Sequence, residues 1–144
     1  MSKNPKQPQE HILQKQRERK LKQYINSHLS KAANIAFSQN GLVYFTELGA
    51  EETVKKMRLD LFSEPEIFAS LPEWISPVDN TEPRAEGLRV DDQGRVLIAE
   101  SGTGKLLRMT PDARKLEVLA DSYDGYRFTT VKDLAIGQGD DLFV

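Results

Sequence analysis

The sequence predicts an all-β fold, a β-propeller of about two and a half blades that follows a basic helical arm. Residues 33–69 and 85–120 run through the same order of elements: a short apolar strand, a polar turn with Gly, a stronger apolar strand, a loop, a third strand, a turn and a fourth strand. The unit starts a third time at Lys132. Four short strands per unit, repeated about every 40–50 residues, are typical of propeller blades.

These repeats divide the chain into an arm at residues 1–32 and a partial propeller at 33–144, with blades at 33–70 and 85–120 and the start of a third at 132–144. A closed propeller needs at least about four blades. The last three residues, 142–144, are apolar and are expected to be in a strand, whose edge would lack a partner. We therefore expect the chain to be the N-terminal part of a longer propeller.

Composition excludes several classes of protein. The chain has no cysteine, so a disulfide framework, a thiolate zinc site and a cysteine nucleophile are excluded. No apolar run approaches the length of a membrane span. The basic N-terminus is not followed by the apolar region of a secretory signal, and we expect a cytoplasmic protein.

The arm carries a charge opposite to that of the rest. Residues 1–32 hold eight Lys and Arg against two Glu, a net of +6, and the remainder carries a net of −8. Residues 1–9 are polar, with two prolines, and are expected to be disordered. Residues 10–29 lack Pro and Gly and predict one amphipathic helix. Arg17 interrupts its apolar stripe, which consists of Leu13, Leu21, Tyr24, Ile25, His28 and Leu29.

The helix has two interpretations. Its basic face could contact RNA or an anionic membrane, or the helix could pack on the propeller edge or be a solvated leader. No aromatic residues are interleaved for base stacking, so no nucleic-acid partner is expected. His11 and His28 have no second ligand at helical spacing and are interpreted as ordinary helix residues.

In the first blade, strands are expected at residues 34–38, 42–47, 54–60 and 66–69, with Asn40-Gly41 supplying the first turn. Residues 71–83 are rich in Pro, Asp and Asn and predict a loop between blades. Within it, Trp74 and Ile75 are expected to be buried because of their large apolar area.

In the second blade, strands are expected at residues 87–91, 95–100, 105–110 and 115–120, after which 121–131 crosses to the next blade. Asp91 and Asp92 are expected to be turn residues, and Pro111 to occupy the second position of a turn. Residues 101–106, SGTGKL, look like the tail of a phosphate-binding loop. The more distant upstream Gly of such a loop, a Ser or Thr directly after the Lys, and a following helix are all missing, so a hairpin turn is predicted.

From Ala85 onward the residues resemble a known family. The stretches AEGL at 85–88, DQGR at 92–95, and above all LADSYDGYRF at 119–128 resemble the gluconolactonase, senescence-marker and luciferin-regenerating family. The likeness covers residues 33–144. It implies a six-bladed propeller that hydrolyses lactones or related esters, with a small lactone or sugar acid as its substrate. It also implies one divalent metal, calcium or zinc, at the mouth of the central channel; oxygen ligands suit calcium.

Several positions depart from the family pattern. The family's first blade usually opens with Glu-Gly-Pro, whose Glu is a metal ligand, but here Ala33-Asn34-Ile35 stands there. The family's second blade often opens with Asn-Gly-Leu, and here Glu86 takes the place of the Asn. Glu86 is therefore the best candidate for a metal or substrate contact; the alternative interpretation is that it is a solvated carboxylate at the end of a strand. The family's Asn-Ser-Pro-Asn-Asp corresponds to Thr-Thr-Val followed by Lys132 and Asp133.

The remaining candidates follow from the same resemblance. Asp133 and Lys132 are the candidates for a catalytic role, and Asn34 is a further candidate metal ligand. Lys132 would oppose a metal ion by like-charge repulsion, and Asp133 could instead cap the turn into the next strand. Arg127 could bind a substrate, or form a salt bridge between blades or stack on Tyr126 or Tyr123.

Three functions remain open. The first is a lactonase-like hydrolase with one divalent metal. The second is a non-catalytic propeller that binds a ligand or a protein, favoured by the altered Glu and Asn positions. The third is a small interaction module made of residues 1–144 alone, which would need an oligomer to cover its open sheet edges. The sequence does not fix the oligomeric state.

Overall fold

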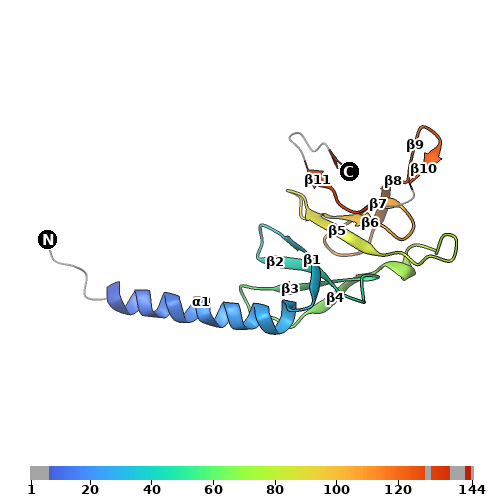
Figure 1. Ribbon diagram of the computed structural model, residues 1–144. Coiled ribbons are helices and arrows are strands. Elements are labelled where there is room, and N and C mark those ends of the chain that lie inside the picture. Colours follow the sequence, from blue (N-terminus) through green and yellow to red (C-terminus); the bar gives the residue numbers. More distant parts are fainter. Residues whose placement is uncertain (1–6, 129–130, 137–141, 144) are drawn as a thin grey trace. The chain divides into compact units, whose positions relative to one another are not determined.

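The computed structural model describes residues 7–128, 131–136 and 142–143 (Figure 1). It forms two compact units, Met1–Ser30 and Lys31–Val144. The first unit contains the helix, and the second contains the sheets. The sheets confirm the predicted partial propeller.

The first unit is the helix α1 (Gln7–Leu29). It begins three residues before the predicted start, because Pro8 lies in the first turn, where no intrahelical N–H bond is lost. The rest of the segment expected to be disordered, residues 1–6, lies outside the described residues. The apolar stripe is weaker than predicted: Leu13 is exposed and Leu29 is buried. His28 packs its ring on Tyr24, with ring centroids 4.2 Å apart. None of the described helices combines the length and hydropathy needed to cross a bilayer.

The first blade is a four-stranded antiparallel sheet in the order β1-β2-β3-β4. Its strands are β1 (Ala32–Phe37), β2 (Leu42–Glu47), β3 (Thr53–Arg58) and β4 (Glu66–Ser70). The second strand matches its prediction fully, and the others differ at their ends by one or two residues. Gly41, with φ of 79°, makes the left-handed turn that Asn40-Gly41 predicted.

The second blade repeats this arrangement in the order β5-β6-β7-β8. Its strands are β5 (Ala85–Val90), β6 (Val96–Glu100), β7 (Lys105–Met109) and β8 (Leu116–Ala120). Lys105 begins a strand, so the hairpin predicted at 101–106 is confirmed. The amide of Ala113 donates to the carbonyl of Thr110 at 2.9 Å, which places Pro111 at the predicted second position of a turn.

Two short pairs follow the second blade. A hairpin of β9 (Ser122–Tyr123) and β10 (Tyr126–Arg127) lies inside the segment predicted to cross between blades. Then β11 (Ala135–Ile136) pairs antiparallel with β12 (Leu142–Phe143), which fits the predicted opening of a third blade. The remaining positions of that blade, 137–141 and 144, lie outside the described residues.

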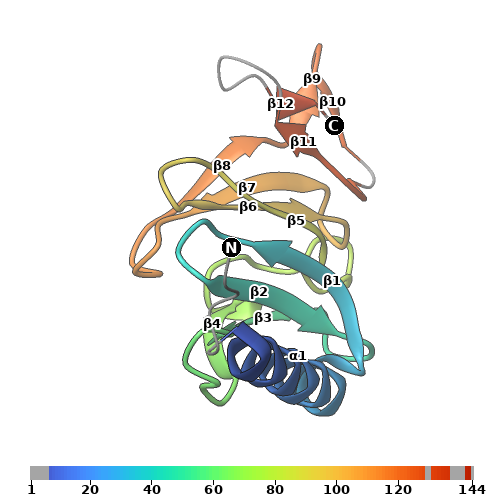
Figure 2. The same ribbon diagram turned by 90° about the vertical axis from the view of Figure 1, so that its left-hand side faces the viewer.

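The two complete blades pack face against face, with the inner strands β1 and β5 side by side (Figure 2). One buried cluster joins them and includes Tyr44, Leu71, Leu88, Ile98 and Leu107. A second cluster on the other face of the second blade joins Leu97, Ala99 and Leu106 to Val131 and Leu134. Each fully buried Leu or Ile stabilises the fold by about 1.5–3 kcal/mol.

The loop between the blades corrects one prediction. Its short helix η1 (Leu71–Glu73) makes a single turn, which places Leu71 and Ile75 on the same inward side. Ile75 is buried as expected, with 7% exposed, but Trp74 is 42% exposed. The burial predicted for Trp74 is therefore wrong, because the turn directs it away from the side that carries Leu71 and Ile75.

Candidate functional site

Both inner strands open with a bulge, and the two bulges define equivalent positions. In β1, Ala32 pairs with Glu47 and Asn34 with Thr46. In β5, Ala85 pairs with Glu100 and Gly87 with Ala99. The extra residues are therefore Ala33 in the first blade and Glu86 in the second. The structural equivalent of Glu86 is Ala33, and Asn34 corresponds to Gly87.

Glu86 is half-buried at the start of β5. Among the described residues, the structure gives its carboxylate neither a hydrogen bond nor an ion pair. A bulge turns a side chain away from the regular alternation of the strand, and bulges are frequent next to active sites. Glu86 is thus a half-buried carboxylate that is available to bind a ligand.

Gly87 brings the start of the third unit next to Glu86. A Cβ atom at this position would lie 2.9 Å from the Cα and Oδ1 of Asp133 and from the carbonyl oxygen of Lys132. Only a residue without a side chain allows this approach. The close contact places Asp133 and Lys132 beside the strand that carries Glu86.

Asp133 is held by two neighbours. Its Oδ1 accepts a hydrogen bond of 2.8 Å from the amide of Leu134, the turn-capping arrangement given above as its alternative interpretation. The same oxygen lies 3.6 Å from Nη2 of Arg89. Lys132 is exposed. Arg89 was not among the predicted site residues, although a second charged residue three positions after Glu86 in the same inner strand is a signal that could have identified it.

Asn34 is engaged within its own blade. Its side-chain amide donates to the hydroxyl oxygen of Thr46 at 3.1 Å, and its side chain is half-buried. The bond runs across the β1–β2 pair and fixes the amide beside the bulge. The side-chain oxygen of Asn34 has no hydrogen bond among the described residues and is available to a ligand.

Arg127 lies apart from these residues, on the hairpin β9–β10. Its Nη2 lies 3.5 Å from Oδ2 of Asp79, in the loop that precedes the second blade. Both side chains are exposed, so the pair adds little stability. Tyr123 and Tyr126 face each other across the hairpin and are exposed. The pair with Asp79 agrees with the alternative interpretation of Arg127, a salt bridge, rather than with substrate binding.

Glu100 supports the loop behind the site. It is fully buried, and its Oε1 accepts hydrogen bonds from the amides of Arg84 at 2.7 Å and Thr103 at 3.0 Å. Its Oε2 accepts from the hydroxyl of Thr103. The equivalent Glu47 instead forms an ion pair with Lys55. Both carboxylate oxygens of Glu100 are therefore used in holding the chain, whereas the carboxylate of Glu86 has no such partner among the described residues.

The divalent metal implied by the resemblance does not fit these residues by themselves. Among the described residues, no three His, Cys, Asp or Glu side chains gather in a group that could hold a metal ion. Calcium takes about six to eight oxygen ligands. Glu86 supplies a free carboxylate, but Asp133 faces the guanidinium of Arg89. A metal here would need most of its ligands from elsewhere.

Comparisons with known proteins agree with the fold and the resemblance. No protein-family model matches the chain. A gluconolactonase of Zymomonas mobilis is 36% identical over 53 residues, which are 37% of this chain and 15% of that protein. The chain thus spans less than a fifth of the length of this curated relative.

Solved structures share the fold at low sequence identity. A gluconolactonase from Xanthomonas campestris matches with a TM-score of 0.61 and 18% identity, over 77% of this chain and 33% of that one. The virginiamycin B lyase of Staphylococcus aureus matches with a TM-score of 0.53 and 15% identity, over 77% and 33%. A luciferin-regenerating enzyme matches with a TM-score of 0.51 and 15% identity, over 74% and 33%. These likenesses show the fold.

Proposed function

Since part of this chain resembles the gluconolactonase family, we propose that it supplies two blades of a lactone-hydrolysing propeller, with its reactive centre where β1 and β5 begin. The observation that carries this proposal is Glu86. It is half-buried at a bulge, at the end of the blade where the third unit approaches, and it has no partner among the described residues.

Hydrolysis of a lactone requires a base and a group that stabilises negative charge. Water adds to the ring carbonyl carbon, the ring C–O bond breaks, and the product is a hydroxy acid. Glu86 would take a proton from the water as it attacks, and that proton would pass to the ring oxygen as it leaves. Lys132 and Arg89 would stabilise the negative charge that develops on the carbonyl oxygen.

Asp133 and Asn34 would have positioning roles. Asp133 orients Arg89 through their ion pair and is itself fixed by the amide of Leu134. The oxygen of Asn34 would accept a hydrogen bond from a hydroxyl of the substrate. The described residues do not form a site for the calcium or zinc that the resemblance implies, so these steps use protein groups alone.

A second function has support of its own. The ion pair of Arg89 with Asp133 and the exposed Lys132 bring two cations to the start of β5, where they would oppose a metal ion by like-charge repulsion. Ala33 stands at the bulge position equivalent to Glu86 and removes a carboxylate there. These features suit a propeller that binds an anionic ligand or a protein without catalysis.

The test is hydrolysis of glucono-δ-lactone and a panel of simple lactones by the complete natural polypeptide that carries this chain. We expect turnover above the uncatalysed rate, and a loss of about 100-fold or more in kcat/KM for Glu86→Gln, because a general base contributes about 10²–10⁴-fold. Glu82→Gln, an exposed carboxylate four positions earlier, is the matched control.

The two functions separate cleanly in this assay. A parent protein with no turnover on any lactone, with or without added calcium or zinc, would exclude the hydrolase and leave the binding propeller. Turnover that survives Glu86→Gln unchanged would remove Glu86 from the mechanism. Calorimetry with each metal on the same protein reports metal binding independently of catalysis.

A further inference from the structure

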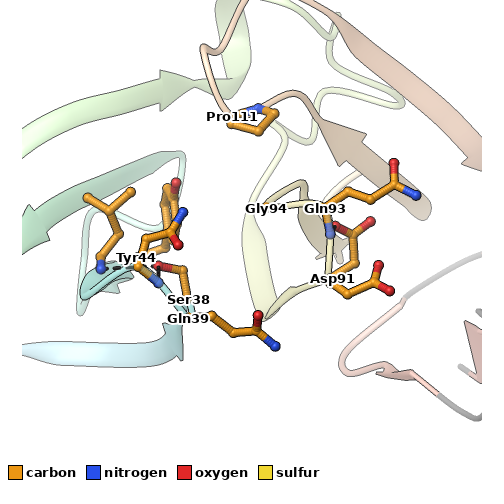
Figure 3. A pocket seen from close by; sticks show the side chains of 10 residues that line it. Ser38, Gln39, Tyr44, Asp91, Gln93, Gly94 and Pro111 are labelled. Carbon is orange, nitrogen blue, oxygen red and sulfur yellow. Dashed lines mark hydrogen bonds between the residues drawn. The ribbon is translucent and has the colours of Figure 1, made fainter.

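A cleft of about 200 Å³ lies between the two complete blades, at the end of the strands opposite to Glu86 (Figure 3). It opens between the first turn of each blade, residues 38–41 and 91–94. Pro111, from the third turn of the second blade, lines it as well. The whole cleft belongs to the second compact unit and does not include any residue of the proposed lactonase site.

The two walls of the cleft are rigid and built alike. Ser38 Oγ accepts hydrogen bonds from the amides two and four residues further on, at 3.2 and 3.1 Å. Asp91 Oδ1 accepts the equivalent two bonds, both at 2.9 Å. Gly41 and Gly94 close the turns with φ of 79° and 78°. Each turn therefore holds its middle residues in place before any ligand arrives.

The middle side chains of these turns are not engaged. The structure gives Gln39, Asn40, Asp92 and Gln93 no side-chain hydrogen bond or ion pair within the described part of the chain. Carboxamides offer two donors and an acceptor each, and the carboxylate offers acceptors. The cleft thus presents several polar groups from two opposing sides (Figure 3).

Tyr44 is the second and independent observation. Its side chain lines the cleft although only 1% of the residue is exposed. Its ring packs edge-on against Phe68, with centroids 4.8 Å apart. Its hydroxyl has no hydrogen-bond partner among the described residues and is not closed off from solvent, so it can be reached by a ligand in the cleft. Burial raises the pKa of Tyr44 above its usual value of about 10, so the hydroxyl remains a donor at neutral pH.

The charged side chains that line the cleft favour a neutral ligand over an anion or a cation. The carboxylate of Asp91 is paired with Arg95, whose Nε lies 2.6 Å from Oδ2. Asp92 is the lining carboxylate that has no ion-pair partner among the described residues, and its negative charge disfavours anions. One exposed charge in water attracts a cation only weakly. Leu42 and Pro111 add apolar surface to the same cleft.

We propose that this cleft binds a neutral, polyhydroxylated ligand about the size of a monosaccharide. Hydroxyl groups of such a ligand would pair with the carboxamides, with Asp92 and with the hydroxyl of Tyr44, and its C–H face would lie on Leu42 or Pro111. The volume suits this size, since pockets for drug-sized ligands begin at about 300 Å³. The site would be additional to the lactonase site and independent of it.

The test is a titration of the full ¹⁵N-labelled chain with D-glucose, D-galactose, myo-inositol and glycerol, followed by NMR. We expect saturable shifts of the amides at 39–40 and 92–93 with at least one of these probes. Tyr44→Phe keeps the ring against Phe68 and is expected to weaken binding about three- to tenfold through the loss of one hydrogen bond. Gln93→Ala, in an exposed turn, is the second variant, and Glu82→Gln, an exposed carboxylate outside the cleft, is the matched control with unchanged binding.

Three results would overturn the proposal. The first is no saturable shift with any neutral polyol. The second is tighter binding at the same amides by sodium gluconate or arginine methyl ester, which would show an ion site. The third is a Tyr44→Phe and a Gln93→Ala variant that both bind as the parent does. None of these results depends on lactone hydrolysis, so the two proposals fail separately.

Discussion

Replacing Glu100 by Ala would remove the group that holds the loop of residues 101–104 against the second blade. Glu100 is fully buried, and its carboxylate accepts hydrogen bonds from the amide of Arg84 and from both the amide and the hydroxyl of Thr103. These bonds tie together the start of β5, the end of β6 and the loop between β6 and β7. The loop and β5 both lie beside the proposed site.

The size of the effect follows from the donors left behind. Ala provides no acceptor, so the two amides lose their partner, and a buried unsatisfied donor costs about 1–3 kcal/mol. We expect Glu100→Ala to lower the free energy of unfolding by about 3–5 kcal/mol. Glu100→Gln keeps one oxygen for the amides, and the hydroxyl of Thr103 can turn to accept from the new NH₂ group. We therefore expect about 1–2 kcal/mol for Gln.

Urea unfolding of the chain, followed by circular dichroism and by the fluorescence of Trp74, measures both values. Glu66→Ala is the matched control, because Glu66 is an exposed carboxylate on β4 and should change the free energy of unfolding by less than about 0.5 kcal/mol. A Glu100→Ala protein within 1 kcal/mol of the parent would refute the reasoning. It would mean that the two amides find other acceptors without cost.

Two further predictions concern the same blade. Gly102→Ala should destabilise the chain far more than Gly49→Ala, because the new Cβ at Gly102 would lie 1.9 Å from the carbonyl oxygen of Glu82. At Gly49, in the first blade, no atom lies within 4 Å and the cost comes from its φ of 83° alone; equal melting temperatures would contradict this. The hydrogen bond from Arg108 lowers the pKa of the Glu117 carboxyl. The stability from this pair is present above the unfolded pKa of about 4.3 and is lost as pH falls through the lowered folded value. Arg108→Met should raise the pKa of Glu117 in an NMR titration, and an unchanged pKa would exclude Arg108 as the cause.

Most of the fold could be predicted because its signals are local. The strands of both blades follow from runs of apolar residues bounded by turns, and the turn at Asn40-Gly41 follows from the left-handed backbone that Gly allows. The observed ends of several strands differ from the predicted ends by one or two residues, because pairing with a neighbouring strand, rather than composition, decides where a strand stops. Trp74 was misassigned because a single helical turn decides which of two adjacent residues points inward.

The site could be predicted only in part. Glu86 was a candidate because it stands where the resembling family often has Asn at the opening of the second blade, and its site role stays a prediction. Arg89 was not identified, because its role depends on Asp133, which belongs to the next unit and reaches it only through the close approach at Gly87. Sequence spacing carries no information on such a contact.

The sequence by itself determined that this protein is built from repeated four-stranded units after a basic helix, because strand periodicity and turn glycines act over a few neighbouring residues. Only the tertiary structure decided which carboxylates are available. Glu100 and Glu86 both flank the start of the second blade, yet the first is buried and fully bonded, while the second has no partner among the described residues. The difference arises because hydrogen-bond partners are brought together by packing between segments that are distant in the chain.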